Sequence, residues 1–112
     1  MKATIWHNPR CSKSREALAI LQASPGVDVG VLEYLRNPPA PDELRRILGR
    51  AGLSARDVLR RGEPEAQGLD QASDDDIVGA MMMHPLLIER PIVETEKGAV
   101  LGRPPERVRD IL

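Results

Sequence analysis

The first 34 residues switch from strand-like to helix-like patterning and back, and this switch constrains the fold more than any other feature of the chain. Ala3–His7 is a short β-prone run, and Pro9 ends it. Apolar residues recur at helical spacing in Glu16–Leu21, and they alternate as in a strand in Val27–Tyr34. A strand, a helix and a strand in this order form a βαβ unit, whose strands are parallel and joined by a right-handed crossover.

The remainder of the chain predicts helices followed by a β-hairpin. The proline-rich segment Arg36–Pro41 stops regular structure and acts as a stiff linker. Gly98 supplies a positive φ to the hairpin turn. The elements predicted after the linker are helices at Asp42–Arg50, Ser54–Arg61 and Ser73–Met81, strands at Pro91–Thr95 and Ala99–Leu101, and a terminal helix at Pro105–Leu112.

The order of these elements is βαβ, helices, ββα. It predicts an α/β protein with a thioredoxin-like fold and a helical insertion at about residues 42–88 between the two halves. In that fold the proline before the third strand is often cis and lies near the thiol, and Pro91 is the residue in that place. Because 112 residues suffice for one core and are too few for two, we predict a single domain over residues 1–112.

Composition and charge exclude several classes of protein. The formal net charge of −1 and the pI near 6.1 provide no general basic field, so a nucleic acid is not expected as the main partner. No apolar run approaches the roughly 20 residues that span a bilayer, and no secretory signal pattern opens the chain. We therefore expect a cytoplasmic protein in which any anion site is local.

Cys11 is the only cysteine of the chain. One cysteine and two scattered histidines allow neither an intramolecular disulfide nor a zinc site of the usual spacing, so no metal is expected. A lone cysteine is often a small buried hydrophobe. Cys11 instead opens the polar, cationic segment Ser12–Arg15 at a helix N-terminus, a setting that favours a thiolate over a thiol. We interpret it as a reactive nucleophile.

The segment His7–Arg15 closely resembles the thiol motif of the glutaredoxin-dependent arsenate reductases, the ArsC type of the ArsC/Spx superfamily. The combination of motifs is far more specific than any one of them, and it covers nearly the whole chain. The further matches, in family order, are Tyr34-Leu35, Asn37-Pro38-Pro39, Asp42-Glu43-Leu44, Leu59-Arg60, Arg90-Pro91-Ile92-Val93 and Gly102-Arg103-Pro104.

The resemblance implies that Cys11 attacks arsenate while three arginines, Arg60, Arg90 and Arg103, hold the oxyanion. The chemistry suits this assignment, because guanidinium groups present planar pairs of donors to tetrahedral oxyanions and stay charged at any working pH. Prolines flank Arg90 and Arg103 and fix their backbone beside the hairpin.

Two further side chains near the thiol have open roles. His7 either adds to the electrostatics of the site and orients a proton, as a catalytic residue, or is simply hydrogen-bonded at the end of its strand. Ser14, like Ser12, is either a helix cap or a ligand of the substrate anion.

Two neighbouring thiol chemistries are excluded. A phosphate loop of the tyrosine-phosphatase kind requires arginine six places after the cysteine, where this chain has Ala17. A dithiol oxidoreductase requires Cys-x-x-Cys, and Ser14 stands at the second position.

Electron counting then indicates the partners. Reduction of arsenate to arsenite takes two electrons, one from each of two thiols, and this chain has one thiol. We expect glutathione as the external co-substrate thiol, with no bound cofactor, and glutaredoxin as the protein that resolves the resulting mixed disulfide. The alternatives are a regulatory protein of the Spx type that binds RNA polymerase, or a thiol oxidoreductase that acts on another oxyanion or on a mixed disulfide.

Overall fold

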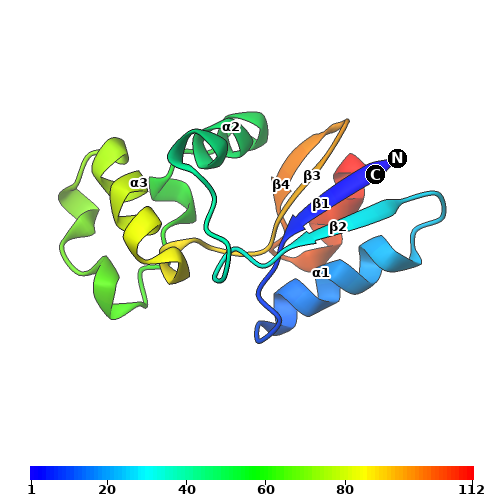
Figure 1. Ribbon diagram of the computed structural model, residues 1–112, viewed down its shortest axis with the longest axis horizontal. Helices are drawn as coiled ribbons and strands as arrows, with labels where there is room; N and C mark the ends of the chain where they lie inside the picture. The colour runs from blue at the N-terminus through cyan, green and yellow to red at the C-terminus, as the bar shows by residue number, and fades with distance from the viewer. The chain divides into compact units, whose positions relative to one another are not determined.

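The computed structural model describes all 112 residues, and the chain divides into two compact units (Figure 1). The first unit combines Met1–Asn37 with Arg90–Leu112, and the second is the continuous segment Pro38–Glu89. The second unit corresponds to the predicted helical insertion. That both units fold as a single domain stays a prediction. No helix in the structure is both long enough and apolar enough to cross a membrane.

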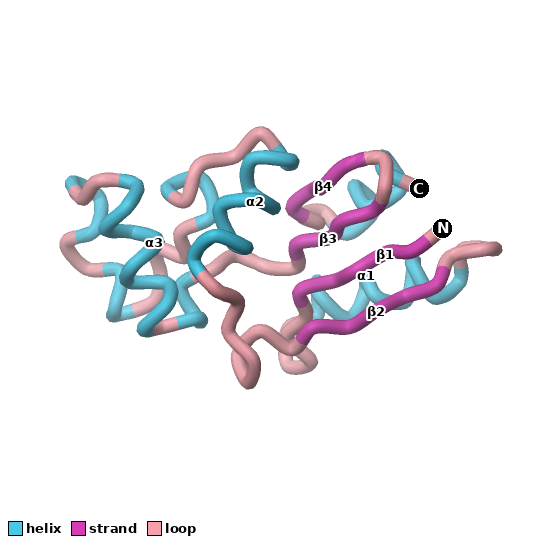
Figure 2. Tube along the Cα trace, turned by 45° about the horizontal axis from the view of Figure 1, so that its top comes forward, coloured by secondary structure: helices cyan, strands magenta, loops and turns pink.

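The first unit is a four-stranded sheet with the order β2-β1-β3-β4, shown in magenta in Figure 2. The strands are β1 (Lys2–Trp6), β2 (Asp28–Leu32), β3 (Ile92–Thr95) and β4 (Gly98–Leu101). β1 is parallel to β2 and antiparallel to β3, and β3 and β4 form the hairpin. The predicted βαβ unit and hairpin, and with them the α/β class, are confirmed.

The core of the first unit lies on one face of this sheet. Helix α1 (Ser12–Ala23) and the 3-10 helix η5 (Pro105–Ile111) contact each other there. Alternate residues of β1 point into this layer, because side chains along a strand alternate between its two faces. The buried cluster consists of Ala3, Ile5, Ala17, Leu21, Val93, Val108 and Ile111. Its small aliphatic side chains suit a chain that has no phenylalanine.

Two elements of the first unit differ from the prediction. β2 ends at Leu32, so that Tyr34 lies beyond the strand and is completely buried. The terminal helix begins at Pro105, as predicted, but it is a 3-10 helix. Its buried residues Pro105, Val108 and Ile111 are three positions apart, which is the repeat of a 3-10 helix and places all three on one side.

The second unit contains α2 (Pro41–Ala51) and α3 (Asp74–Met83), which contact each other and are joined by short 3-10 turns. Helix α2 extends one residue beyond the predicted range at each end, and α3 begins after the predicted cap Ser73 but continues two residues beyond Met81. Gly52 adopts a left-handed conformation with φ +70° after α2, and the Ser73 hydroxyl accepts the Asp76 N–H at the start of α3. The joining turns are η1 (Arg56–Val58), η2 (Pro64–Ala66) and η3 (Leu69–Gln71), and a fourth turn, η4 (Pro85–Leu87), follows α3.

The helix predicted over Ser54–Arg61 is wrong in length. The capping box itself forms, since the Ser54 N–H donates to Asp57 Oδ2 at 2.9 Å and the Asp57 N–H donates to Ser54 Oγ at 3.3 Å. Only the single 3-10 turn η1 follows, because Leu59 becomes extended and forms a β-bridge with Ile88.

Both X-Pro bonds that flank the hairpin are cis. The Arg90–Pro91 bond is cis, as predicted, and the Arg103–Pro104 bond is cis as well, which the sequence did not indicate. Gly102 lies next to Pro91, because its N–H donates to the Pro91 carbonyl at 2.8 Å.

Replacing Gly102 by alanine should destabilise the protein by about 1–3 kcal/mol. A Cβ atom at this position would lie 2.9 Å from Pro91 Cγ and 3.3 Å from Val108 Cγ1, and both of these side chains are buried. Gly79→Ala is the matched control, because a Cβ there meets nothing within 4 Å inside helix α3. It should stabilise by about 0.5–1 kcal/mol. Urea denaturation measures both changes, and equal effects would contradict the packing argument.

Candidate active site

Cys11 is the N-cap residue of helix α1, as the sequence predicted. Its side chain is partly exposed and makes no capping hydrogen bond. The backbone around it is fixed, since the Cys11 N–H donates to the Asn8 carbonyl and the Arg15 N–H donates to the Cys11 carbonyl, both at 3.0 Å. The thiol therefore sits at the positive end of the α1 dipole, which stabilises negative charge on sulfur.

Asn8 shapes the loop that carries the thiol, a role the sequence analysis missed. Its side chain is buried, with 6% of its surface exposed, and Oδ1 accepts the Arg10 N–H at 3.0 Å. Its own N–H donates to Ser14 Oγ at 3.1 Å. Asparagine favours such turns because its side chain bonds to the backbone two residues on, and the Asn8-Pro9 pair was the available signal.

His7 and Ser14 form a buried hydrogen-bonded pair beside this loop. His7 Nδ1 lies 2.6 Å from Ser14 Oγ, and the His7 N–H donates to the Leu32 carbonyl at 2.8 Å. Ser14 therefore joins the end of β1 to the first turn of α1, while Ser12 is exposed. Burial lowers the pKa of the His7 imidazole below its ordinary value; the charge of Glu33 opposes this shift and that of Arg15 adds to it.

The buried His7–Ser14 pair should make the free energy of unfolding depend on pH. Because the pKa of His7 is lower in the folded protein than in the unfolded chain, its contribution is complete above about pH 6.5 and is lost as the pH falls below that value. Between pH 7 and pH 5 the wild type should lose more free energy of unfolding than His7→Asn, which keeps a polar atom near the place of Nδ1. Urea titrations at both pH values measure the difference, and identical losses would contradict it.

Arg90 and Arg103 lie together at the end of the sheet from which the thiol loop also leaves. The strand register pairs Trp6 with Ile92 and Ile92 with Leu101, so the segments just beyond these three residues emerge at one end. These segments are the loop from β1 to Cys11, the segment with Arg90 that leads into β3, and the segment with Arg103 that follows β4. Arg103 Nη1 donates to the Arg90 carbonyl at 3.1 Å.

The guanidinium of Arg90 has unused donors. Only 7% of the residue is exposed, and its Nε and Nη1 atoms are buried without a hydrogen-bond partner. An unpaired buried cation is costly, so such a group usually has a ligand or a function. Each of these N–H groups can donate a charge-assisted hydrogen bond to an oxygen of an oxyanion.

Arg60 belongs to the second unit. Its Nη1 lies 3.2 Å from Glu63 Oε1 and its Nε lies 3.9 Å from Glu89 Oε1, while its N–H donates to the Leu87 carbonyl at 2.8 Å. Its convergence with Cys11 stays a prediction. No group of three or more histidine, cysteine, aspartate and glutamate side chains is arranged to hold a metal ion.

Comparison with known proteins places this arrangement in a family. The family model described as "ArsC family" matches residues 6–111. A protein of Rhizobium meliloti named arsenate reductase is 43% identical over 116 residues, covering 100% of this chain and 82% of the relative. An arsenate reductase of Acidiphilium multivorum is 46% identical, covering 97% of this chain and 79% of the relative.

A solved structure agrees with these relatives. The structure titled arsenate reductase from Vibrio cholerae has a TM-score of 0.91 and 44% identity, covering 100% of this chain and 98% of that one. This likeness confirms the predicted thioredoxin-like fold. A match along nearly the whole sequence, joined to the same fold, leads to one conclusion: the chain belongs to the ArsC family.

Proposed function

We propose that the protein reduces arsenate to arsenite, with Cys11 as the nucleophile. The observation that carries the proposal is that the only thiol caps helix α1 at the end of the sheet where Arg90 and Arg103 meet. The names of the relatives that are 43–46% identical support the same substrate.

The oxyanion would be held by arginines. Arg90 offers two buried donors without a partner, and Arg103 lies against its backbone. Arg60 is the third arginine of the proposed set, on the family resemblance. Ser14 and His7 act through the loop: their hydrogen bond fixes the first turn of α1, and with it the backbone of Cys11. We therefore assign both as positioning residues.

The proposed chemistry balances with one protein thiol and one external thiol. The Cys11 thiolate attacks arsenic and forms a sulfur–arsenic(V) bond, while one arsenate oxygen takes up protons from solution and leaves as water. A second thiolate, from glutathione, then attacks the arsenic atom. Arsenic takes up two electrons and leaves as arsenite, while the two sulfurs each give up one electron and form a Cys11–glutathione disulfide. Glutaredoxin reduces this disulfide and returns the free thiol, in the cytoplasm.

A turnover assay with arsenate, glutathione and glutaredoxin tests the function directly, with arsenite as the measured product. Enzyme incubated with arsenate and glutathione but without glutaredoxin should accumulate one glutathione adduct on Cys11, visible by mass spectrometry of the intact protein. Sustained turnover with thioredoxin alone, in the absence of glutathione, contradicts the scheme. Failure to form arsenite with all components present contradicts the proposed substrate.

A further inference from the structure

Three exposed cations flank Cys11 in the sequence, within four residues of the thiol. They are Arg10, Lys13 and Arg15, here called the cationic rim. The first turn of α1 contains no acidic residue, whereas α2 and α3 carry two and three acids in their first turns. Acids stabilise a helix N-terminus and cations destabilise it by about 0.3–1 kcal/mol each. Helix stability therefore does not explain why Lys13 and Arg15 are there.

The geometry of Arg15 directs its charge toward the thiol loop. Its Nη1 donates to the Pro9 carbonyl at 2.9 Å, so the guanidinium folds back over the loop, to a residue two places before Cys11. The positive charge of Arg15 also acts on the buried imidazole of His7, since it contributes to the lowering of the pKa of that group. The guanidinium is thus held in place by the backbone and still faces solvent.

No carboxylate neutralises the two arginines of the rim. Neither Arg10 nor Arg15 forms an ion pair with an acidic side chain. Lys13 has one distant contact, 3.9 Å from Glu16 Oε2, between side chains that are 48% and 55% exposed. An exposed pair at that distance contributes little. The rim therefore presents positive charge to whatever approaches Cys11.

We infer that the cationic rim binds the carboxylates of glutathione and thereby brings its sulfur to Cys11. The inference rests on the proposed function and names how its co-substrate is recognised. Glutathione is a small thiol with two carboxylates and one ammonium group, so it is a net anion at neutral pH. Guanidinium groups bind carboxylates in paired hydrogen bonds. Arsenate binds instead to the guanidinium of Arg90, which is buried and so, unlike the cationic rim, is shielded from water.

Thiol–disulfide exchange tests the rim without arsenate. Cys11 is reacted with glutathione disulfide, forming the Cys11–glutathione disulfide and releasing one glutathione thiolate, and separately with uncharged hydroxyethyl disulfide. Arg15→Gln should slow the reaction with glutathione disulfide about 3- to 10-fold and leave the reaction with hydroxyethyl disulfide within about 2-fold. Arg10→Gln should act in the same direction, and added salt should weaken the wild-type preference.

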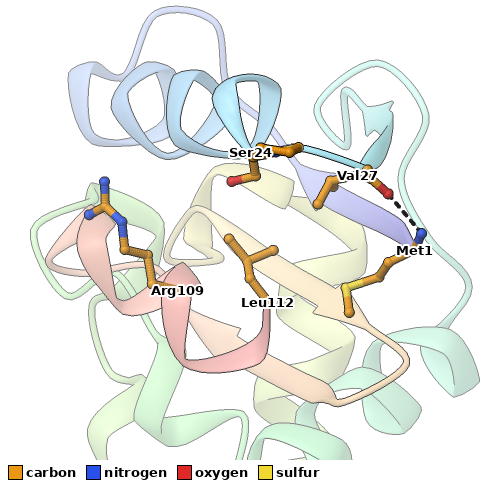
Figure 3. A pocket seen from close by; sticks show the side chains of 7 residues that line it. Met1, Ser24, Val27, Arg109 and Leu112 are labelled. Atoms are coloured by element: carbon orange, nitrogen blue, oxygen red, sulfur yellow. Dashed lines mark hydrogen bonds between the residues drawn. The ribbon is translucent and has the colours of Figure 1, made fainter.

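Arg109→Gln is the matched control in the same unit. Arg109 belongs to η5 and lines a pocket of about 420 Å³ together with Ser24, which follows the far end of α1 from the thiol, and with Met1, Val27 and Leu112 (Figure 3). It should leave both exchange rates unchanged. In arsenate turnover, the rim variants should raise the KM for glutathione and leave the KM for arsenate unchanged.

Two results overturn the inference. If Arg15→Gln slows the reactions with both disulfides equally, the charge of Arg15 increases the reactivity of the Cys11 thiolate and does not bind glutathione. If it slows neither reaction, the cationic rim does not recognise carboxylates. Both readings come from exchange chemistry alone. They stay distinct from a failure of the proposed function, which shows as wild-type enzyme that exchanges normally and forms no arsenite.

Discussion

Cys11→Ser is expected to abolish arsenite formation and to leave the protein at least as stable as the wild type. The loss of turnover should be about 10³-fold or more, because a serine hydroxyl is not ionised at neutral pH and no other thiol can replace it. Stability should stay or rise, by up to about 1 kcal/mol. Cys11 is an N-cap without a side-chain hydrogen bond, and serine is among the preferred N-cap residues.

Cys11→Ala separates the two effects. It should be equally inactive, and it should lack the gain in stability, because alanine has no atom that can accept a helix N–H. Arsenite formation and urea denaturation of the three proteins measure both properties. Measurable turnover by Cys11→Ser, or unfolding of this variant under assay conditions, would speak against Cys11 as a partly exposed nucleophile on a preformed helix.

Arg90→Met is the second replacement with a large expected effect, and its two consequences have opposite signs. The value of kcat/KM for arsenate should fall about 10²- to 10³-fold, as it does when a donor to a reacting oxyanion is removed. The free energy of unfolding should rise by about 1–3 kcal/mol, because a buried charge with two unpaired donors is replaced by an apolar side chain.

Anion binding provides an independent measurement on the same variant. In the wild type, arsenate at 100 times its Kd should stabilise the folded protein by about 2.7 kcal/mol, and this increment should vanish in Arg90→Met. Arg103→Met is the comparison, since its side chain is exposed: it should lose activity without becoming more stable. An Arg90→Met protein that is less stable and fully active would refute the assignment of Arg90 as an oxyanion ligand.

The fold was predictable where the pattern of apolar residues and the capping residues agreed. The change in the spacing of apolar residues along Ala3–Tyr34, from strand-like to helix-like and back, sufficed to predict the βαβ unit. Gly52 and Ser73 correctly marked the end of α2 and the start of α3. Cys11 was placed correctly for the same reason, because Pro9 ends one element and the helical repeat begins the next.

Other features depend on contacts that no local pattern reveals. The Ser54–Asp57 capping box forms as expected, but its helix stops after one turn because Leu59 pairs with Ile88, far along the chain. The hydrogen bond between His7 and Ser14 requires the loop geometry that Asn8 sets, so its partners were visible in the sequence while their pairing was not. The isolation of the Arg90 guanidinium is likewise a property of packing.

The position of β1 in the middle of the sheet has a consequence for how the chain folds as it leaves the ribosome. Thr4 pairs with Gly30, 26 positions on, and with Glu94, 90 positions on. At about 5–20 residues per second, roughly 3–13 s pass between the synthesis of these two partners. During that interval the nascent chain can close its parallel pair, while the other edge of β1 remains open to pairing with foreign strands. The reactive cysteine thus emerges seconds before Arg90 and Arg103, and the second half of the sheet both seals that edge and brings these arginines to the end of the sheet where the thiol lies.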